Sequence, residues 1–506
     1  MLQLLGFLPE IFLSIVIFLQ LIVNLWDLTK NNQRYKAIID SEVPIQVLLI
    51  IILSLVLLSS LRISYVEASS IYGISFGRIS LKIFVCMAYF LVIFPIYRAF
   101  ITEKINFYEF FIITNLYILA TFFLFSSYDL LLVFIAFELQ SFCLYTLSGI
   151  SRTSAFSAEA ALKYFLIGAA GTLFFLIGCC CILISIGSLN FFVIDSFNIV
   201  THVSDQFSSD LKLLKIGIWL IYFSLLVKLA CFPFQAWAAD VYDGVPLCST
   251  IFFSIIPKVS LFSFFFLWFK ITSVWIYDLQ PFFLLLGFLT TFVGTFSALK
   301  QKRIKRMLVF SSIAQSGFLI ATLGTSNGEL DACLLTFLFI YILTSLIIWG
   351  SFALLYLSKN KIAIYFNKIE QQPYYITDSE HLFKSSKNFG FNLGLAFFSL
   401  AGIPPLVGFF AKAFILFNLL SLNYFFIPIL FLTVAIFSTY YYIRMIKIFL
   451  FNSVDSKLFF GPLFSQNSIF FDVFILGIYS FILVASFFSP TTLFVIIYYI
   501  STFILV

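Results

Sequence analysis

Long apolar runs recur along the whole chain and are separated by short polar connections. Each run of about 20 residues is long enough to cross a hydrocarbon core of about 30 Å as an α-helix, and the runs lack the alternation that membrane barrel strands require. The pattern therefore predicts an all-α integral membrane protein with about fourteen transmembrane helices. The predicted spans are residues 3–25, 43–61, 83–101, 108–126, 129–149, 158–185, 216–238, 246–269, 280–299, 307–325, 332–357, 389–421, 425–443 and 469–488.

The composition agrees with a chain that has little water-facing surface. Of the 506 residues, 62% are hydrophobic and 10% are charged, and the mean hydropathy is +1.10, whereas soluble domains carry about 25% charged residues. The longest polar connections, 189–214 and 358–388, are too short to form a soluble domain. The N-terminal sequence MLQLLGFLPEIFLS has no basic region and no small-residue cleavage site, which favours a first span over a signal peptide.

Basic residues are distributed unequally between the predicted loops. Nineteen Lys and Arg residues fall in odd-numbered loops and six in even-numbered loops, counting those at the span ends. Because positively charged loops stay on the cytoplasmic or matrix side, the odd loops are predicted on that side and both termini on the other. The same excess explains the net charge of +6, so nucleic-acid binding is not expected.

The sequence offers no ligand set for a redox cofactor. Its two histidines, His202 and His381, lie in polar connections, whereas a membrane haem needs axial ligands within spans. No CxxC pair occurs, and the adjacent Cys179, Cys180 and Cys181 point in different directions on a helix, so they cannot chelate one ion. No phosphate-binding or dinucleotide motif is found. We therefore expect no cofactor on this chain, and an energy source in another subunit or an ion gradient.

Charged residues inside predicted spans are the candidates for function. A charge at the bilayer centre costs about 2.5–3.5 kcal/mol, and such residues commonly mark ion pathways. Lysines near span ends can instead extend to the headgroups, and this reading suits Lys163 best, because it begins its span four residues after Glu159. The five candidates are Glu138, Lys163, Lys228, Lys258 and Lys412.

Two of these lysines lie next to prolines that interrupt their spans. Pro233 follows Lys228 by five residues in LLVKLACFPFQAW. Pro404 and Pro405 precede Lys412 in SLAGIPPLVGFFAK. Proline removes a backbone donor, and broken helices are tolerated at membrane depth where they line a polar cavity or are buried in protein. A packing kink would explain one break, but two breaks, each with a buried lysine, favour an ion path.

A buried lysine suits proton transfer because its charge state depends on its surroundings. Desolvation favours the neutral form, whereas a nearby carboxylate favours the charged form. A carboxylate that approaches and withdraws can therefore make a lysine take up and release a proton. Since Glu138 is the one carboxylate near the middle of a predicted span, we expect it to form a switchable pair with Lys228.

Other polar residues have simpler interpretations. Asp240 and Asp243, in AADVYDGVP, are interpreted as residues that end one helix and cap the next, rather than as metal ligands. The run KQKRIKR, residues 300–306, is interpreted as a basic anchor of the matrix or cytoplasmic side.

Seven motifs, in this order, resemble subunit 2 of the NADH dehydrogenase of respiratory complex I. They are LLVFIAFELQSFCLYTLSG, EAALKYFLIGA, LLVKLACFPFQAWAADVYDGVP, FFSIIPKVS, IKRMLVFSSIAQSGF, SLAGIPPLVGFFAK and STYYYIRMIK, and they lie within residues 105–450. SLAGIPP and IKR…SSIAQ are shared with Mrp-type cation/proton antiporters and with the sister subunits 4 and 5. DVYDGVP followed by FFSIIPK is similar to subunit 2 in particular.

The resemblance implies a proton-translocating subunit driven by NADH-to-quinone electron transfer elsewhere in the complex. It implies that Glu138 is the family's carboxylate on the fifth helix, and that the lysines of the sixth, seventh, eighth and twelfth helices are Lys163, Lys228, Lys258 and Lys412. The implied divisions are an N-terminal three-helix segment (1–105), two inverted five-helix repeats (106–270 and 271–450) and a C-terminal helix and tail (451–506).

One position departs from the family. Many members have PFH where this chain has Pro233, Phe234 and Gln235, so a titratable group is missing at Gln235. Either water connects Lys228 to Lys258, or that step differs here.

The resemblance also implies a location and partners. The residues found within the motifs and the 72 phenylalanines favour a mitochondrial gene. The expected location is therefore the mitochondrial inner membrane, with both termini facing the intermembrane space. Expected partners are lipids, protons and other membrane-arm subunits, including the sister antiporter-like subunits. NADH, FMN, iron–sulfur clusters and quinone are expected on other subunits.

Two other functions remain open. A stand-alone cation/proton antiporter of the Mrp type would exchange Na⁺ or K⁺ for protons. A non-transporting membrane scaffold would keep coupling intact when all five charges are neutralised.

Overall fold

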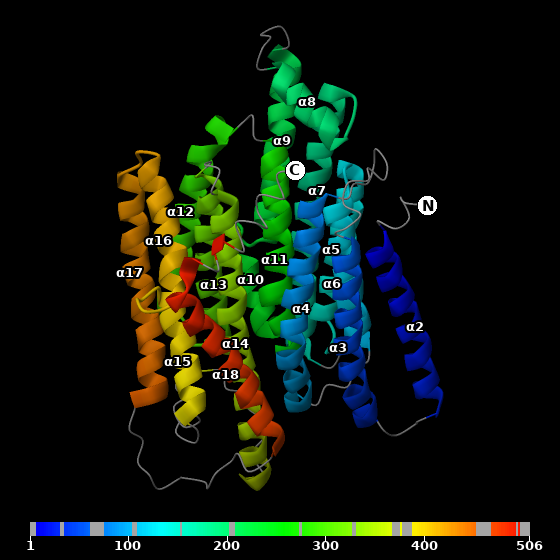
Figure 1. Ribbon diagram of the computed structural model, residues 1–506, viewed down its shortest axis with the longest axis vertical. Helices are drawn as coiled ribbons and strands as arrows, with labels where there is room; N and C mark the ends of the chain where they lie inside the picture. The colour runs from blue at the N-terminus through cyan, green and yellow to red at the C-terminus, as the bar shows by residue number, and fades with distance from the viewer. Residues whose placement is uncertain are drawn as a thin grey trace.

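Nearly all of the described chain is α-helical (Figure 1). The computed structural model describes residues 7–30, 35–60, 75–103, 109–151, 154–201, 208–272, 276–325, 330–366, 375–376, 387–451, 467–491 and 494–495. Within these residues the extended pairings are two isolated β-bridges, Asp129 with Asn190 and Arg303 with Tyr375. The all-α prediction is therefore confirmed, while His202 and His381 lie outside the described residues.

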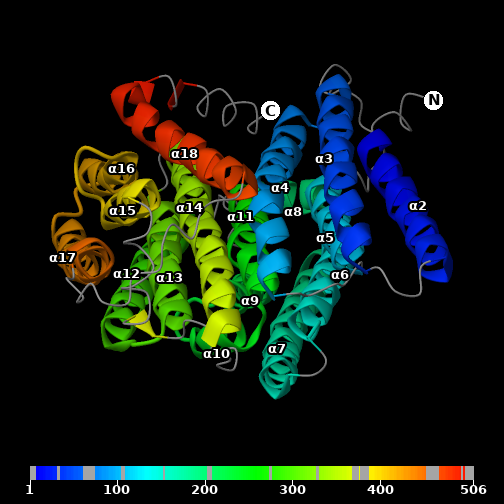
Figure 2. The same cartoon turned by 90° about the horizontal axis from the view of Figure 1, so that it is seen from below.

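The helices run mostly side by side along the long axis of the molecule (Figure 1). In order they are α2 (Leu8–Lys30), α3 (Tyr35–Ser60), α4 (Phe76–Glu103), α5 (Glu109–Ser126), α6 (Leu130–Ser148), α7 (Ala155–Ile186), α8 (Phe191–Thr201), α9 (Ser208–Lys228), α10 (Ala236–Gly244), α11 (Leu247–Ile271), α12 (Ile276–Lys300), α13 (Ile304–Leu323), α14 (Leu330–Phe366), α15 (Lys387–Ala401), α16 (Val407–Ser421), α17 (Phe426–Ile446) and α18 (Asn467–Phe488). Seen from below, the bundle extends from α2 and α3 to α17, and α18 lies across α14 (Figure 2) and also contacts α15.

Each of the fourteen predicted spans contains helix in the described structure. Ten helices among the described residues are long and apolar enough to cross a membrane. Four further apolar helices are shorter, namely Leu8–Asn24, Gly390–Ala401, Val407–Ser421 and Phe474–Phe488. A multi-pass helical membrane protein is thus confirmed, and the total number of crossings stays a prediction.

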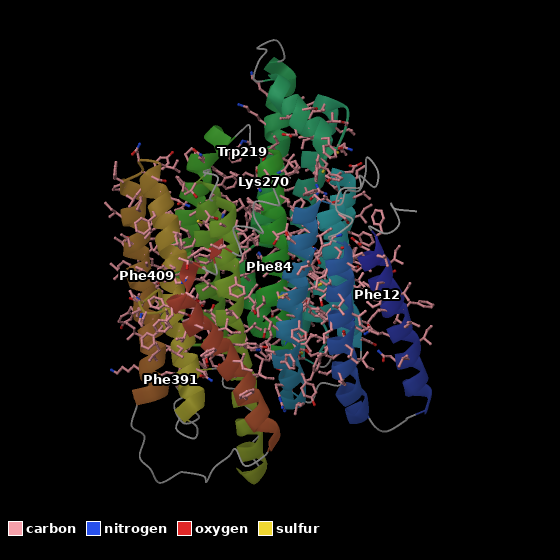
Figure 3. The ribbon with its side chains drawn as sticks, viewed as in Figure 1. Phe12, Phe84, Trp219, Lys270, Phe391 and Phe409 are labelled. Atoms are coloured by element: carbon pink, nitrogen blue, oxygen red, sulfur yellow. The ribbon has the colours of Figure 1, made fainter. Side chains whose placement is uncertain are left out.

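Helix α11 forms the centre of the bundle. It is apolar on all sides, and nearly all of its residues are buried, as expected for a helix surrounded by protein. It contacts α4, α14 and α13. At the periphery, Phe391 and Phe409 are labelled on the α15–α16 side in Figure 3, with exposed fractions of 63% and 39%. Since the peripheral side chains are exposed whereas α11 is enclosed by protein, α11 is the helix best placed to hold a shielded polar group.

The two predicted proline-broken helices are confirmed. The span at 216–238 is divided into α9 and α10, with Ala230 at φ 55° and Pro233 in the break. The span at 389–421 is divided into α15 and α16, with Gly402 at φ 78° followed by Pro404 and Pro405. Proline donates no hydrogen bond, so carbonyls are released at both breaks and must find other donors.

Candidate functional site

Lys258 lies at the middle of α11 and is only 8% exposed. Its Nζ donates a hydrogen bond to the main-chain oxygen of Ser312 on α13 at 2.9 Å. The same Nζ lies 5.3 Å from the centre of the Tyr341 ring on α14. Lys258 therefore contacts two neighbouring helices in the core and does not extend toward lipid headgroups.

Lys228 is the last residue of α9, directly before the break. Its Nζ lies over the ring of Phe137 on α6, 4.3 Å from the ring centre. The next residue on α6, Glu138, accepts a hydrogen bond from Ser141 at 3.4 Å. Lys228 thus lies beside the residue that precedes Glu138, no direct ion pair joins the two, and their switchable pairing stays a prediction.

A cavity of about 30 Å³ lies between Lys228 and Lys258, and both lysines line it. A water molecule needs about 10–15 Å³ of such space, so the cavity has room for about two. Lys228 also lines a second cavity of about 20 Å³, which reaches Ser141 and Tyr145. Lys228 therefore borders one cavity that it shares with Lys258 and another that it shares with residues of α6.

Lys412 on α16 reaches across the second break to the end of α15. Its Nζ donates to the main-chain oxygens of Leu400 at 2.8 Å and Ala401 at 3.0 Å. The last carbonyls of a helix have no partner within the helix and carry partial negative charge. The break thus supplies acceptors for a side chain that is 8% exposed. A Cβ atom at Gly408 would overlap the Ser399 oxygen, so glycine permits this close approach of α16 to α15.

Tyr341 links the surroundings of Lys258 to those of Lys412. Its ring lies beside Lys258, and it also lines a cavity of about 10 Å³ together with Lys412 and Gln315. The Tyr341 hydroxyl donates to the Ser254 oxygen at 2.7 Å. Tyr341 is not among the candidates predicted from the sequence, although a tyrosine within an apolar run is a signal that could have indicated it.

Lys163 lies apart from the other four candidates. Its Nζ is 2.8 Å from Glu159, which confirms the pair expected from their spacing, and 3.1 Å from Asp240 on α10. The side chain is 42% exposed. Lys163 lines none of the three cavities described above.

The capping interpretation of Asp240 and Asp243 is wrong, because both residues lie inside α10 and make ion pairs. Asp243 contacts Arg303 at 2.6 Å and Arg306 at 2.9 Å, and Arg306 also contacts Asp240 at 3.0 Å. The basic run at 300–306 is therefore more than an anchor. Sequence reasoning could not reveal these pairs, because about sixty residues separate the partners.

The carboxylate that caps α11 belongs instead to Glu103 on α4. It accepts hydrogen bonds from the backbone N–H groups of Leu247 at 2.6 Å and Cys248 at 3.5 Å. Burial raises the pKa of the Glu103 carboxyl, against the opposing effects of Lys305 and of these two N–H groups. Lys305, counted among the loop and span-end charges in the sequence analysis, is 8% exposed and donates to the Val245 oxygen at 3.0 Å.

A second charged pair is buried near the N-terminus. Lys82, also counted with the loop and span-end charges, lies inside α4 and contacts Glu10 on α2. The carboxylate that makes this burial possible lies 72 residues earlier in the chain, so the pair was not visible in the sequence.

Gln235 lies outside the lining of the cavity between Lys228 and Lys258. Its buried Oε1 atom has no hydrogen-bond partner among the described residues. Trp237, two residues later, donates from its indole to the Val227 oxygen at 3.2 Å and so satisfies a carbonyl beside the break.

The described residues contain no group of three or more His, Cys, Asp or Glu side chains that could hold a metal ion. What the site offers is a series of buried or half-buried ammonium groups with one carboxylate, with water-sized cavities beside them. Such an arrangement can hold and transfer protons.

Comparison with known proteins gives consistent matches. The family described as "NADH:quinone oxidoreductase/Mrp antiporter, TM" matches residues 127–438. The chain is 30% identical to NADH-ubiquinone oxidoreductase chain 2 of Marchantia polymorpha, over 78% of this chain and 76% of that protein. It is 34% identical to NADH-quinone oxidoreductase subunit N of Wolbachia sp. subsp. Brugia malayi, over 66% and 68%. A chain of respiratory complex I from Thermus thermophilus shares the fold, with a TM-score of 0.71 at 21% identity over 98% of both chains.

Proposed function

Because the chain belongs to the NADH:quinone oxidoreductase/Mrp antiporter family of membrane subunits, we propose that it moves protons along an axis of Glu138, Lys228, Lys258 and Lys412. It is a proton-translocating membrane subunit of complex I and is similar to chain 2 and subunit N. The complex is an NADH:quinone oxidoreductase. Electron transfer takes place on other subunits, and this chain contributes no redox centre of its own.

The cavity that Lys228 and Lys258 share is the observation that carries this proposal. About two water molecules fit between the two ammonium groups, so a proton can pass without a titratable group at Gln235. Tyr341 and the next cavity extend the axis to Lys412.

A change in the distance between Glu138 and Lys228 changes the free energy of a proton on Lys228 by enough to move that proton against the membrane potential. Moving one proton against about 150–180 mV costs about 3.5–4 kcal/mol. Leaving a buried charge without its partner is destabilising by about 3–5 kcal/mol. A carboxylate that approaches Lys228 and then withdraws from it therefore changes the free energy of the proton by about the required amount.

Lys163 takes part in proton translocation through its contact with Asp240 on α10, at the edge of the axis. Residues 106–270 and 271–450 form the two inverted repeats, each with one broken helix. Residues 1–105 form the N-terminal segment and residues 451–506 the C-terminal helix and tail. Partners include the sister antiporter-like subunits and lipid. The protein lies in the mitochondrial inner membrane with both termini in the intermembrane space.

Replacement of the central lysine tests the function. Lys258→Met in the assembled complex, reconstituted into vesicles, should stop proton pumping while the amount of assembled enzyme stays normal. Unchanged pumping per assembled complex would contradict the proposal. Exchange of Na⁺ or K⁺ for protons by the isolated chain would instead support an antiporter of the Mrp type.

A further inference from the structure

The short helix α10 forms part of the wall of the Lys228–Lys258 cavity. Trp237, Ala238 and Tyr242 of this helix line the cavity. Asp240 and Asp243, three residues apart, lie on one face, whereas Ala238 and Tyr242, four residues apart, lie on another. One face of α10 thus closes the cavity, and a second face carries two carboxylates.

The two carboxylates join α10 to helices on either side. We define the α10 ion-pair cluster as Asp240, Asp243, Lys163, Arg303 and Arg306. Arg306 of α13 contacts both aspartates, whereas Lys163 of α7 contacts Asp240. Asp243 is 8% exposed, and its Oδ1 atom has no hydrogen-bond partner among the described residues. The cluster therefore connects the two predicted repeats at the helix that closes the cavity.

Nonhelical residues separate α10 from α9 and from α11, so α10 is a short helix distinct from both neighbours. The nonhelical residues 229–235 precede its nine residues, and only Val245 and Pro246 separate it from α11. Apolar contacts already hold α10 in place, including the stacking of Trp237 on Tyr164 with ring centres 5.0 Å apart. Four of the five charged side chains are between 33% and 44% exposed. Because exposed ion pairs contribute only about 0–1 kcal/mol each, stability alone does not explain five charges at this place.

We infer that α10 is a gate between the Lys228–Lys258 cavity and the bundle end that carries Arg303, and that the α10 ion-pair cluster holds this gate shut. The inference rests on the proposed function, because it concerns access of protons to the same cavity. Asp240, Asp243, Arg303 and Arg306 are positioning residues. They do not carry the transferred proton, and they act by setting the position of the cavity wall.

Passive proton leak provides the test. The assembled complex is reconstituted into vesicles without NADH, and the decay of an imposed pH difference is followed. Asp243→Asn removes the ion pairs to both arginines and should speed the decay by at least about fivefold, the lower end of typical coupling between linked elements. Arg303→Gln should give a smaller increase, because Arg306 still contacts Asp243. Lys302→Gln changes an exposed basic residue beside Arg303 and is the matched control, for which the decay should stay unchanged.

A double variant separates the gate from general damage. Lys258→Met combined with Asp243→Asn should return the decay to the wild-type rate, because the leak passes along the axis. A leak that persists in the double variant, or equal leaks for Asp243→Asn and Lys302→Gln, would overturn the inference. If Lys258→Met abolishes pumping while Asp243→Asn causes no leak, the gate is wrong and the proposed function stands. If Lys258→Met leaves pumping intact, the proposed function itself is wrong, and the gate fails with it.

Discussion

Lys82 on α4 and Glu10 on α2 form an ion pair inside the bundle, with Nζ and Oε1 2.5 Å apart. Their side chains are 4% and 2% exposed. The pair lies outside the proposed axis and joins the first described helix to the rest of the protein. Both charges are withdrawn from solvent, so each depends on the other.

Removing one member of this pair should be more harmful than removing both. Lys82→Met leaves the Glu10 carboxylate buried without its partner and should lower stability by about 3–5 kcal/mol. The double variant Glu10→Leu/Lys82→Met should cost clearly less. The temperature at which the assembled complex dissociates in detergent measures both effects. Equal losses for the single and double variants would contradict a direct dependence.

The Glu138–Lys228 interaction should appear as non-additivity. Glu138→Gln and Lys228→Met should each impair pumping, and the double variant should differ from the sum of the two by about 0.5–3 kcal/mol. The cycle is measured on pumping rates normalised to assembled enzyme. Additivity within about 0.5 kcal/mol would mean that the two residues act independently.

Lys412 should be the last proton carrier of the internal axis. Lys412→Met removes the donor to the Leu400 and Ala401 oxygens and should slow proton transfer by about 10²- to 10⁴-fold. Assembly should remain near normal. Failed assembly with unchanged pumping per complex would show that Lys412 only caps α15.

The cavity between Lys228 and Lys258 should matter more than Gln235. Ala238→Leu places a larger side chain in the cavity wall and should reduce pumping strongly by displacing water. Gln235→Leu is the matched control, because it also introduces a leucine but lies outside the cavity lining. It should leave pumping nearly unchanged. The opposite order of effects would point to a proton path through residue 235. Both rates are normalised to assembled enzyme, because overpacking itself costs about 1–3 kcal/mol.

Both termini should be accessible from the intermembrane space. The excess of basic residues in the odd-numbered loops puts those loops on the matrix side. Thiol labelling of cysteines introduced at the two ends, in intact inner-membrane vesicles of known orientation, checks this expectation. Labelling of residues 300–306 from the same side as the termini would reverse it.

The sequence by itself determined the helical class, the positions of the spans and the two breaks. Each of these depends on local chemistry that a single segment carries: a run of about 20 apolar residues, or a proline that cannot donate a hydrogen bond. The buried Lys258 and Lys412 could be found for the same reason, since a charge within an apolar run is conspicuous wherever its partner lies.

Only the tertiary structure decided which groups each charge meets. Lys82 pairs with Glu10 across 72 residues of sequence, and Arg303 pairs with Asp243 across 60 residues. Lys412 donates to the Leu400 and Ala401 carbonyls, which lack a partner within the helix because α15 ends there. Lys163, by contrast, pairs at the edge of the bundle with Asp240, a residue first read as a helix cap. Ion pairs and hydrogen bonds depend on distances of a few ångströms between segments, and packing of the whole bundle sets those distances.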